Sequence, residues 1–273
     1  MISPGHRRAP ATRKAPLRIA VPGFAHPLVA PAEWGGLQRT GLPLDWVVLG
    51  AGTLRGTGGP TDGPGGPVGP TDGPGGPVGG PGHRQDPYCL SAVVPLRTSG
   101  VRVLGHLDAG HGTRPFGELL SDAQRYLNWY RVDGFALGRC PTDADGLPGT
   151  RRVVGALRTL LDGAHVVLVQ GGPACSGYAA VADQLVTFAG PWSRYRWSQA
   201  AEWTAEHPPE RFCHLVHGVP RHHLDEALRI ARWQGAGTVY LTDRTDHDDL
   251  DPWESLPGYW DEIVSRIGPG VSE

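Results

Sequence analysis

Residues 131–140, with the sequence RVDGFALGRC, form a short apolar run that follows an aromatic segment with helical spacing. A run of this length and composition is typical of an inner strand of a parallel sheet. Ligands of parallel α/β proteins bind beyond the carboxyl ends of the strands, so a functional site is expected where this strand ends. Gly138, Arg139 and Cys140 stand there, and the strand ends without a carboxylate.

The rest of the chain repeats this alternation of strand and helix. Further strands are predicted over 17–23, 44–49, 101–107, 165–170, 185–188, 213–219 and 238–242. Helical spacing between them is clearest over 115–130 and 224–231, and shorter helices are predicted over 178–183 and from 253 to 267. Eight strands, each followed by a helix-like segment over roughly 250 residues, predict an α/β fold of the (β/α)8 TIM-barrel type. A doubly wound sheet is the alternative, but no glycine-rich phosphate fingerprint follows the first strand.

We divide the chain into a flexible basic arm (1–16), the barrel (17–268) and a short tail (269–273). Residues 51–85 form a Gly/Pro-rich insertion after the second strand, in which 60–69 and 70–79 are the same decapeptide, PTDGPGGPVG. Its few apolar side chains cannot offset the entropy lost on folding, so we expect a disordered loop.

Composition excludes several classes of function. The formal net charge of −2 gives no general electrostatic reason to bind nucleic acid or an anionic membrane. The sequence contains no apolar run of ~18 residues and no signal-like amino terminus, so we expect a cytoplasmic protein. The four cysteines are far apart, which argues against a zinc knuckle and a disulfide framework. We expect free thiols, an inert Cys140, and neither a cofactor nor a metal.

Residues 128–137, NWYRVDGFAL, resemble the Y-x-x-W-Y-x-V-D-G-I-F-L segment of the spherulin-4-like proteins, also called spherulation-specific family 4. Residues 100–106, GVRVLGH, are similar to the family's G-x-x-V-x-G-Y, and DGPG at 62–65 or 72–75 is similar to its N-G-P-G. The resemblance spans about residues 17 to 265. It implies a TIM barrel and, for some members, an endo-acting glycoside hydrolase that cleaves amino-sugar polymers of extracellular matrix.

The family pattern places Asp-Glu at the end of the fourth strand and Glu at the end of the sixth. These positions fall on Gly138, Arg139 and Ala189 in this chain. Glycoside hydrolysis uses two carboxyl groups that flank the scissile bond, one of them protonated. Glycine and alanine transfer no proton, and an arginine opposes the positive charge of the transition state. We therefore expect a degenerate glycoside hydrolase that binds a carbohydrate or another small polar ligand.

Polar and aromatic residues at the predicted strand ends form the candidate ligand-binding set: His26, Asp108, His111, Arg139, Gln170, Trp192, His217 and Asp243. In one alternative, Asp108 and Asp243 form a relocated acid pair of an active glycosidase, although each can instead pair with an arginine or cap a helix. A metal held by His26, His111 and His217 with Asp108 or Asp243 is another alternative, but these residues match no known ligand spacing. Trp192 can stack on a sugar ring or pack over the barrel end. In a last alternative, the protein is an interaction scaffold that uses the decapeptide repeat.

Overall fold

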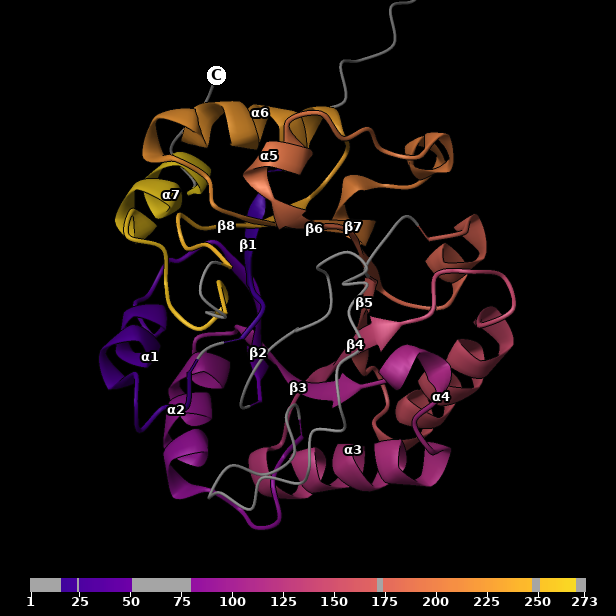
Figure 1. The fold of residues 1–273 in the computed structure, drawn as a ribbon. Helices are drawn as coiled ribbons and strands as arrows, with labels where there is room; N and C mark the ends of the chain where they lie inside the picture. Colours follow the sequence, from indigo (N-terminus) through magenta and orange to yellow (C-terminus); the bar gives the residue numbers. More distant parts are fainter. Residues whose placement is uncertain (1–15, 24, 51–79, 171–173, 247–250, 269–273) are drawn as a thin grey trace, which may run out of the picture.

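The computed structural model describes residues 16–23, 25–50, 80–170, 174–246 and 251–268. Eight parallel strands close into a barrel in chain order, and β8 pairs with β1. The strands are β1 (Arg18–Val21), β2 (Leu44–Leu49), β3 (Arg102–Asp108), β4 (Gly134–Cys140), β5 (His165–Gln170), β6 (Gln184–Pro191), β7 (Phe212–His217) and β8 (Thr238–Leu241). Figure 1 shows the strands around the centre with the helices outside them. The predicted (β/α)8 barrel is confirmed. The decapeptide repeat lies outside the described residues.

The helices are α1 (Pro31–Leu37), α2 (Pro87–Thr98), α3 (Phe116–Tyr130), α4 (Leu147–Leu160), the single turn α5 (Trp192–Tyr195), α6 (Leu224–Trp233) and α7 (Trp260–Ile267). The short helix predicted over 178–183 is instead the 3-10 turn Ser176–Ala180, because the Asp183 N–H already bonds to Val166 as the chain enters β6. The last helix starts only at Trp260, because the preceding loop bonds to other elements, as in the contact of the Leu256 N–H with Glu33. Within the described part of the chain, no helix is both long and apolar enough to cross a membrane.

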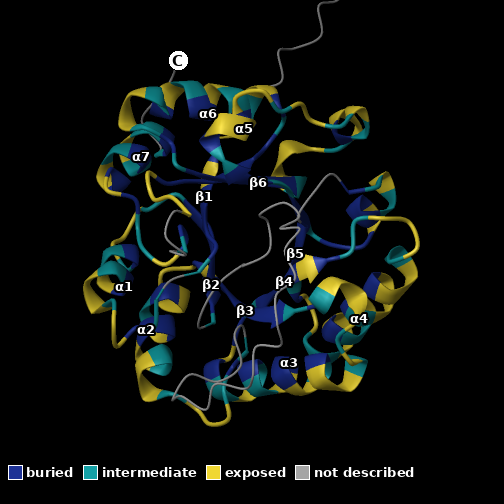
Figure 2. Ribbon diagram, viewed as in Figure 1, coloured by how far each residue is buried: buried dark blue, intermediate teal, exposed yellow. Residues whose placement is uncertain are grey.

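Buried residues concentrate on the strands and on the inward faces of the helices, as the colours of the ribbon in Figure 2 show. All six residues of β2 are buried, as expected for a strand covered on both faces. On α3, Leu119, Ala123 and Tyr126 are buried at helical spacing. The Tyr126 ring lies so close to Gly105 of β3 that an added Cβ would be 2.6 Å from it. Glycine at this strand position therefore lets α3 approach the barrel.

Asp133 ties the amino ends of β3 and β4 together. Its carboxylate accepts the Val103 N–H at 2.9 Å and a guanidinium N–H of Arg97 at 3.1 Å, and its own N–H donates to the Val103 carbonyl at 2.7 Å. Gly134 follows because a Cβ there would lie 1.9 Å from the His165 carbonyl oxygen on β5. The Asp-Gly pair of the family-like segment is thus a structural element at the amino ends of the strands.

Asp183 repeats this arrangement between β5 and β6. Its carboxylate accepts the Val166 N–H at 2.8 Å and a guanidinium N–H of Arg158, from the end of α4, at 3.1 Å. The next residue, Gln184, accepts the indole N–H of Trp46 at 2.6 Å inside the barrel. These contacts of Asp133, Asp183 and Gln184 join neighbouring strands at their amino ends.

Candidate functional site

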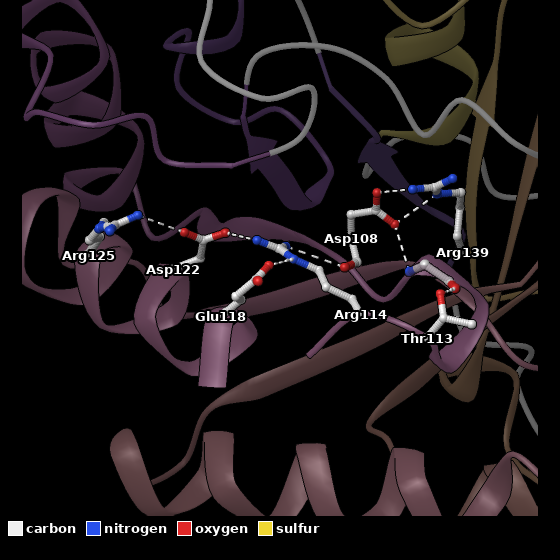
Figure 3. A network of polar contacts seen from close by, with 8 residues as sticks. Asp108, Thr113, Arg114, Glu118, Asp122, Arg125 and Arg139 are labelled. Carbon is white, nitrogen blue, oxygen red and sulfur yellow. Dashed lines mark hydrogen bonds and ion pairs between the residues drawn. The ribbon is translucent and has the colours of Figure 1, made fainter. Parts of the chain in front are cut away.

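The candidate site is built around an ion pair between β3 and β4. Asp108, the last residue of β3, lies opposite Gly138 in the parallel register. The Nε–H of Arg139 donates to Asp108 Oδ1 at 2.8 Å, and a terminal N–H of the same guanidinium donates to Oδ2. Figure 3 shows this pair of side chains, and the Gly110 N–H also donates to Oδ1 at 2.9 Å. Asp108 is therefore paired with an arginine, which is one of the two roles predicted for it.

An irregularity in β4 places Arg139 in this position. The register between β4 and β5 shifts between Leu137 and Cys140, and Arg139 has a left-handed φ of 50°. A bulge of this kind redirects the side chain that it carries. The left-handed conformation costs a non-glycine residue about 1 kcal/mol, which the contact with Asp108 partly offsets.

The ion pair shifts the pKa values of its two partners in opposite directions. Partial burial acts to raise the pKa of Asp108, but the hydrogen bonds from Arg139 and Gly110 and the Arg139 charge outweigh it, so the pKa lies below its usual value. The hydrogen bond with Asp108 raises the pKa of Arg139. Asp108 is therefore ionised at neutral pH. It can accept hydrogen bonds, but it holds no proton to donate as a general acid.

Gly138, Arg139 and Ala189, the positions at which the family resemblance predicts acids, carry no carboxyl group. A Cβ added to Gly138 would lie 2.6 Å from Nε2 of His106, a buried residue of β3. The imidazole thus fills the space into which a side chain at position 138 would extend. Ala189 is buried on β6 beside Leu215 of β7.

A second arginine holds the connection between β3 and α3 in place. Arg114 donates to the carbonyl oxygen of Asp108 at 3.4 Å and pairs with Asp122 and, at 3.6 Å, with Glu118 on α3. Arg125 completes the chain of contacts at 3.0 Å from Asp122. Figure 3 shows these side chains in a row that leads from α3 to the Asp108–Arg139 pair. The position of Asp108 is therefore fixed from both sides.

Two more of the predicted site residues are buried at strand ends. Gln170 ends β5 and donates to the Pro141 carbonyl oxygen at 2.6 Å, which joins it to the chain that leaves β4. Trp192 is 6% exposed, and its ring centroid lies 6.2 Å from that of Tyr195 and 5.5 Å from that of His223. These contacts agree with the packing alternative for Trp192.

The predicted residues after β7 and β8 have separate partners. His217 is buried edge-on against Trp253, with 5.6 Å between ring centroids, and its Nδ1 lies 3.9 Å from the Asp246 carboxylate. Asp243 is exposed and accepts the Gly258 N–H at 2.9 Å. Each of the two proposed relocated acids, Asp108 and Asp243, is thus held by its own set of contacts.

The remaining histidines of the set lie elsewhere. His111 is exposed in a 3-10 turn with a φ of 54°. His26 contacts Asp86 and Cys89, and these three residues form the one group of potential metal ligands among the described residues. The group predicted from His26, His111 and His217 is not found there. Sequence reasoning missed these partners because 60 residues separate His26 from Asp86, which the sequence marks only as a helix start.

The cysteines are free, as predicted. Burial, with the nearby charge of Asp108, raises the pKa of Cys140 to about 12. This thiol is therefore a packed, unreactive group despite its neighbour Arg139.

A cleft of about 640 Å³ lies at the opposite end of the barrel, where Arg102, Asp133 and His165 mark the starts of β3, β4 and β5. It is remote from the carboxyl ends of the strands. Because barrel chemistry is found at the carboxyl ends, we place the candidate site at Asp108 and Arg139 and not in this cleft.

Fold and sequence together define the class of protein. The fold is a closed barrel of eight parallel strands, and residues 68–267 match the model of spherulation-specific family 4. The chain belongs to this family. The matched region begins inside the decapeptide repeat and runs from α2 to the end of α7, so β1 and β2 precede it.

Solved structures with similar folds agree with the barrel. Sph3 of Aspergillus clavatus, in complex with GalNAc, is 22% identical with a TM-score of 0.69, over 93% of this chain and 98% of that one. A glycosyl hydrolase family 2 member from Bacteroides cellulosilyticus is 14% identical with a TM-score of 0.50, over 95% of this chain and 33% of that one. At these identities the similarity supports the fold alone. No curated protein sequence matches the chain significantly.

Proposed function

We propose that this protein binds a carbohydrate or another small polar ligand at the carboxyl ends of its strands, without the hydrolysis that its family's acids carry out. Family membership supports a carbohydrate, and the similarly folded Sph3 was solved with GalNAc. Barrels of this type bind their ligands at this face. An amino sugar such as GalNAc is therefore the first ligand to test.

The Arg139–Asp108 pair is the observation that carries the proposal. An oxocarbenium-like transition state needs a proton donor for the leaving group and negative charge near the sugar. Arg139, at the family's Glu position, supplies neither. The Arg139 guanidinium also forms an ion pair with the neighbouring carboxylate of Asp108. The pKa of Asp108 is lowered, so this carboxylate does not serve as the proton donor.

A relocated acid pair is the alternative. With Asp108 ionised, Asp243 would have to be the protonated partner. Asp243 is an exposed residue in a loop, where its Oδ1 accepts the Gly258 N–H at 2.9 Å. These surroundings favour a binding site over a hydrolytic one.

Arg139 is also the residue best suited to hold a ligand. Its side chain is 41% exposed, and a guanidinium has five N–H donors, of which Asp108 occupies two. The free donors can bind sugar hydroxyl groups or an N-acetyl carbonyl oxygen. Losing one charge-assisted hydrogen bond weakens binding by about tenfold.

Ligand-observed NMR with GalNAc, GlcNAc and their short oligomers tests the proposal. The wild type should bind at least one of them, and Arg139→Ala should bind it about tenfold more weakly. Arg39→Ala is the matched control, because Arg39 forms a surface ion pair with Asp261 at 2.6 Å, and it should bind as the wild type does. Absence of binding across the panel, or equal binding by Arg139→Ala, would contradict the proposal.

A further inference from the structure

His26, Asp86 and Cys89 form a compact cluster outside the site described above. The His26 Nε2 atom lies 3.2 Å from Asp86 Oδ2 and 3.5 Å from Cys89 Sγ, and the three ligand atoms lie within 4.8 Å of one another. His26 belongs to the segment after β1, and the other two residues belong to the first turn of α2 and its cap. Two segments that follow adjacent strands therefore converge on one point.

Local structure presents the three ligand atoms together. Asp86 caps α2 with its other carboxylate oxygen, Oδ1, which accepts the N–H groups of Tyr88 and Cys89. This leaves Oδ2 directed at the His26 ring. The Tyr130 hydroxyl also accepts the Asp86 N–H at 2.9 Å, so the cap is held from α3 as well. Such fixed surroundings are typical of the residues that position metal ligands.

The distances fit tetrahedral zinc coordination. With Zn–N, Zn–O and Zn–S bonds of about 2.0, 2.1 and 2.3 Å, tetrahedral angles place N and O about 3.3 Å apart and N and S about 3.5 Å apart. The observed separations of 3.2 and 3.5 Å are within about 0.1 Å of these values. We propose that His26, Asp86 and Cys89 bind Zn²⁺, with a water molecule or an external ligand as the fourth donor.

Burial and donor chemistry favour zinc over other roles. The His26 and Asp86 side chains are 29% and 36% exposed, so solvent can supply the fourth ligand. Nitrogen and sulfur donors select zinc over magnesium or calcium.

Zinc binding has to break hydrogen bonds that His26 forms with Asp86 and with the Leu28 N–H. The His26 Nδ1 atom accepts the exposed Leu28 N–H at 3.2 Å, so the neutral ring carries its proton on Nε2 and donates it to Asp86. Zinc at Nε2 moves that proton to Nδ1 and breaks the contact with Leu28. Water can replace this solvent-exposed bond, so its loss does not prevent zinc binding.

Calorimetric titration of the full chain with Zn²⁺ tests the site. The wild type should take up one equivalent, and Asp86→Asn and Cys89→Ser should each lower the affinity by about tenfold or more. Asp86→Asn is informative because asparagine caps a helix as well as aspartate does, so the fold is retained while the charged ligand is lost. Titration with Co²⁺ should produce a thiolate charge-transfer absorption that is absent in Cys89→Ser.

Matched controls separate this site from incidental metal binding. Cys175→Ser removes another half-buried free thiol, and His222→Ala breaks a surface pair of histidine rings 4.3 Å apart. Both should bind Zn²⁺ as the wild type does. The proposal fails if the wild type takes up no zinc, if Cys89→Ser binds as tightly as the wild type, or if His222→Ala alone abolishes uptake.

Discussion

Alanine at position 138 should destabilise the barrel through His106. An ideal Cβ on Gly138 lies 2.6 Å from His106 Nε2, and ordinary contact begins at 3.4 Å, so the imidazole has to retreat by about 0.8 Å. His106 is 6% exposed and packed, so this movement overfills a dense region. Overpacking of this kind costs about 1–3 kcal/mol, against a gain of about 0.4–1 kcal/mol from replacing glycine.

The decisive experiment is a double-mutant cycle with Gly138→Ala and His106→Ala. Urea unfolding followed by tryptophan fluorescence should show that Gly138→Ala lowers the free energy of unfolding by about 1–2 kcal/mol in the wild type. In the His106→Ala background the same change should be neutral or stabilising, which gives a coupling energy of about 1–3 kcal/mol.

Gly155→Ala on α4 is the control, because a Cβ there meets no atom within 4 Å, and it should stabilise the protein by about 0.5–1 kcal/mol. An equal cost of Gly138→Ala in both backgrounds would refute the reasoning. It would show that His106 does not occupy the space into which a side chain at position 138 would extend.

Three further predictions concern the backbone and the titration of the fold. The Arg139→Gly variant should be about 0.5–1 kcal/mol more stable than the Arg139→Ala variant. Both variants lose the contact with Asp108, but only glycine relieves the strain of the left-handed backbone at this position. Equal urea midpoints for the two variants would contradict this. Gly134→Ala should cost about 3 kcal/mol or more, because the Cβ would meet the His165 carbonyl at 1.9 Å, and an unchanged melting temperature would refute it. Burial lowers the pKa of His214 from 6.5 to about 3. Between these two pH values the unfolded chain binds a proton at this histidine that the folded chain does not bind. The free energy of unfolding should therefore fall by about 1.4 kcal/mol per pH unit as the pH drops from 6.5 to about 3. His214→Asn should flatten this slope by about one proton, and an unchanged slope would show that other groups cause it.

The fold could be predicted because its signals are local. The apolar runs at 44–49 and 165–170 coincide with β2 and β5, since strands buried on both faces need continuous apolar residues. The last helix and the segment at 178–183 differ from prediction because backbone bonds to distant strands and loops override local helical spacing.

The site could be predicted only in part. Asp108 and Arg139 end adjacent strands, so their proximity follows from parallel order. The left-handed Arg139 and the His106 ring over Gly138 depend on tertiary contacts that no local pattern encodes. The same holds for His26 and Asp86, which come together across a 60-residue separation that includes the Gly/Pro-rich insertion.

The release of reducing ends from amino-sugar polymers tests the central claim most directly. The wild-type protein, incubated with polymers of GalNAc and of GlcNAc, should release none above a protein-free control, while it binds at least one of the sugars. Turnover by the wild type that either Asp108→Asn or Asp243→Asn abolishes would contradict the account and establish a relocated acid pair.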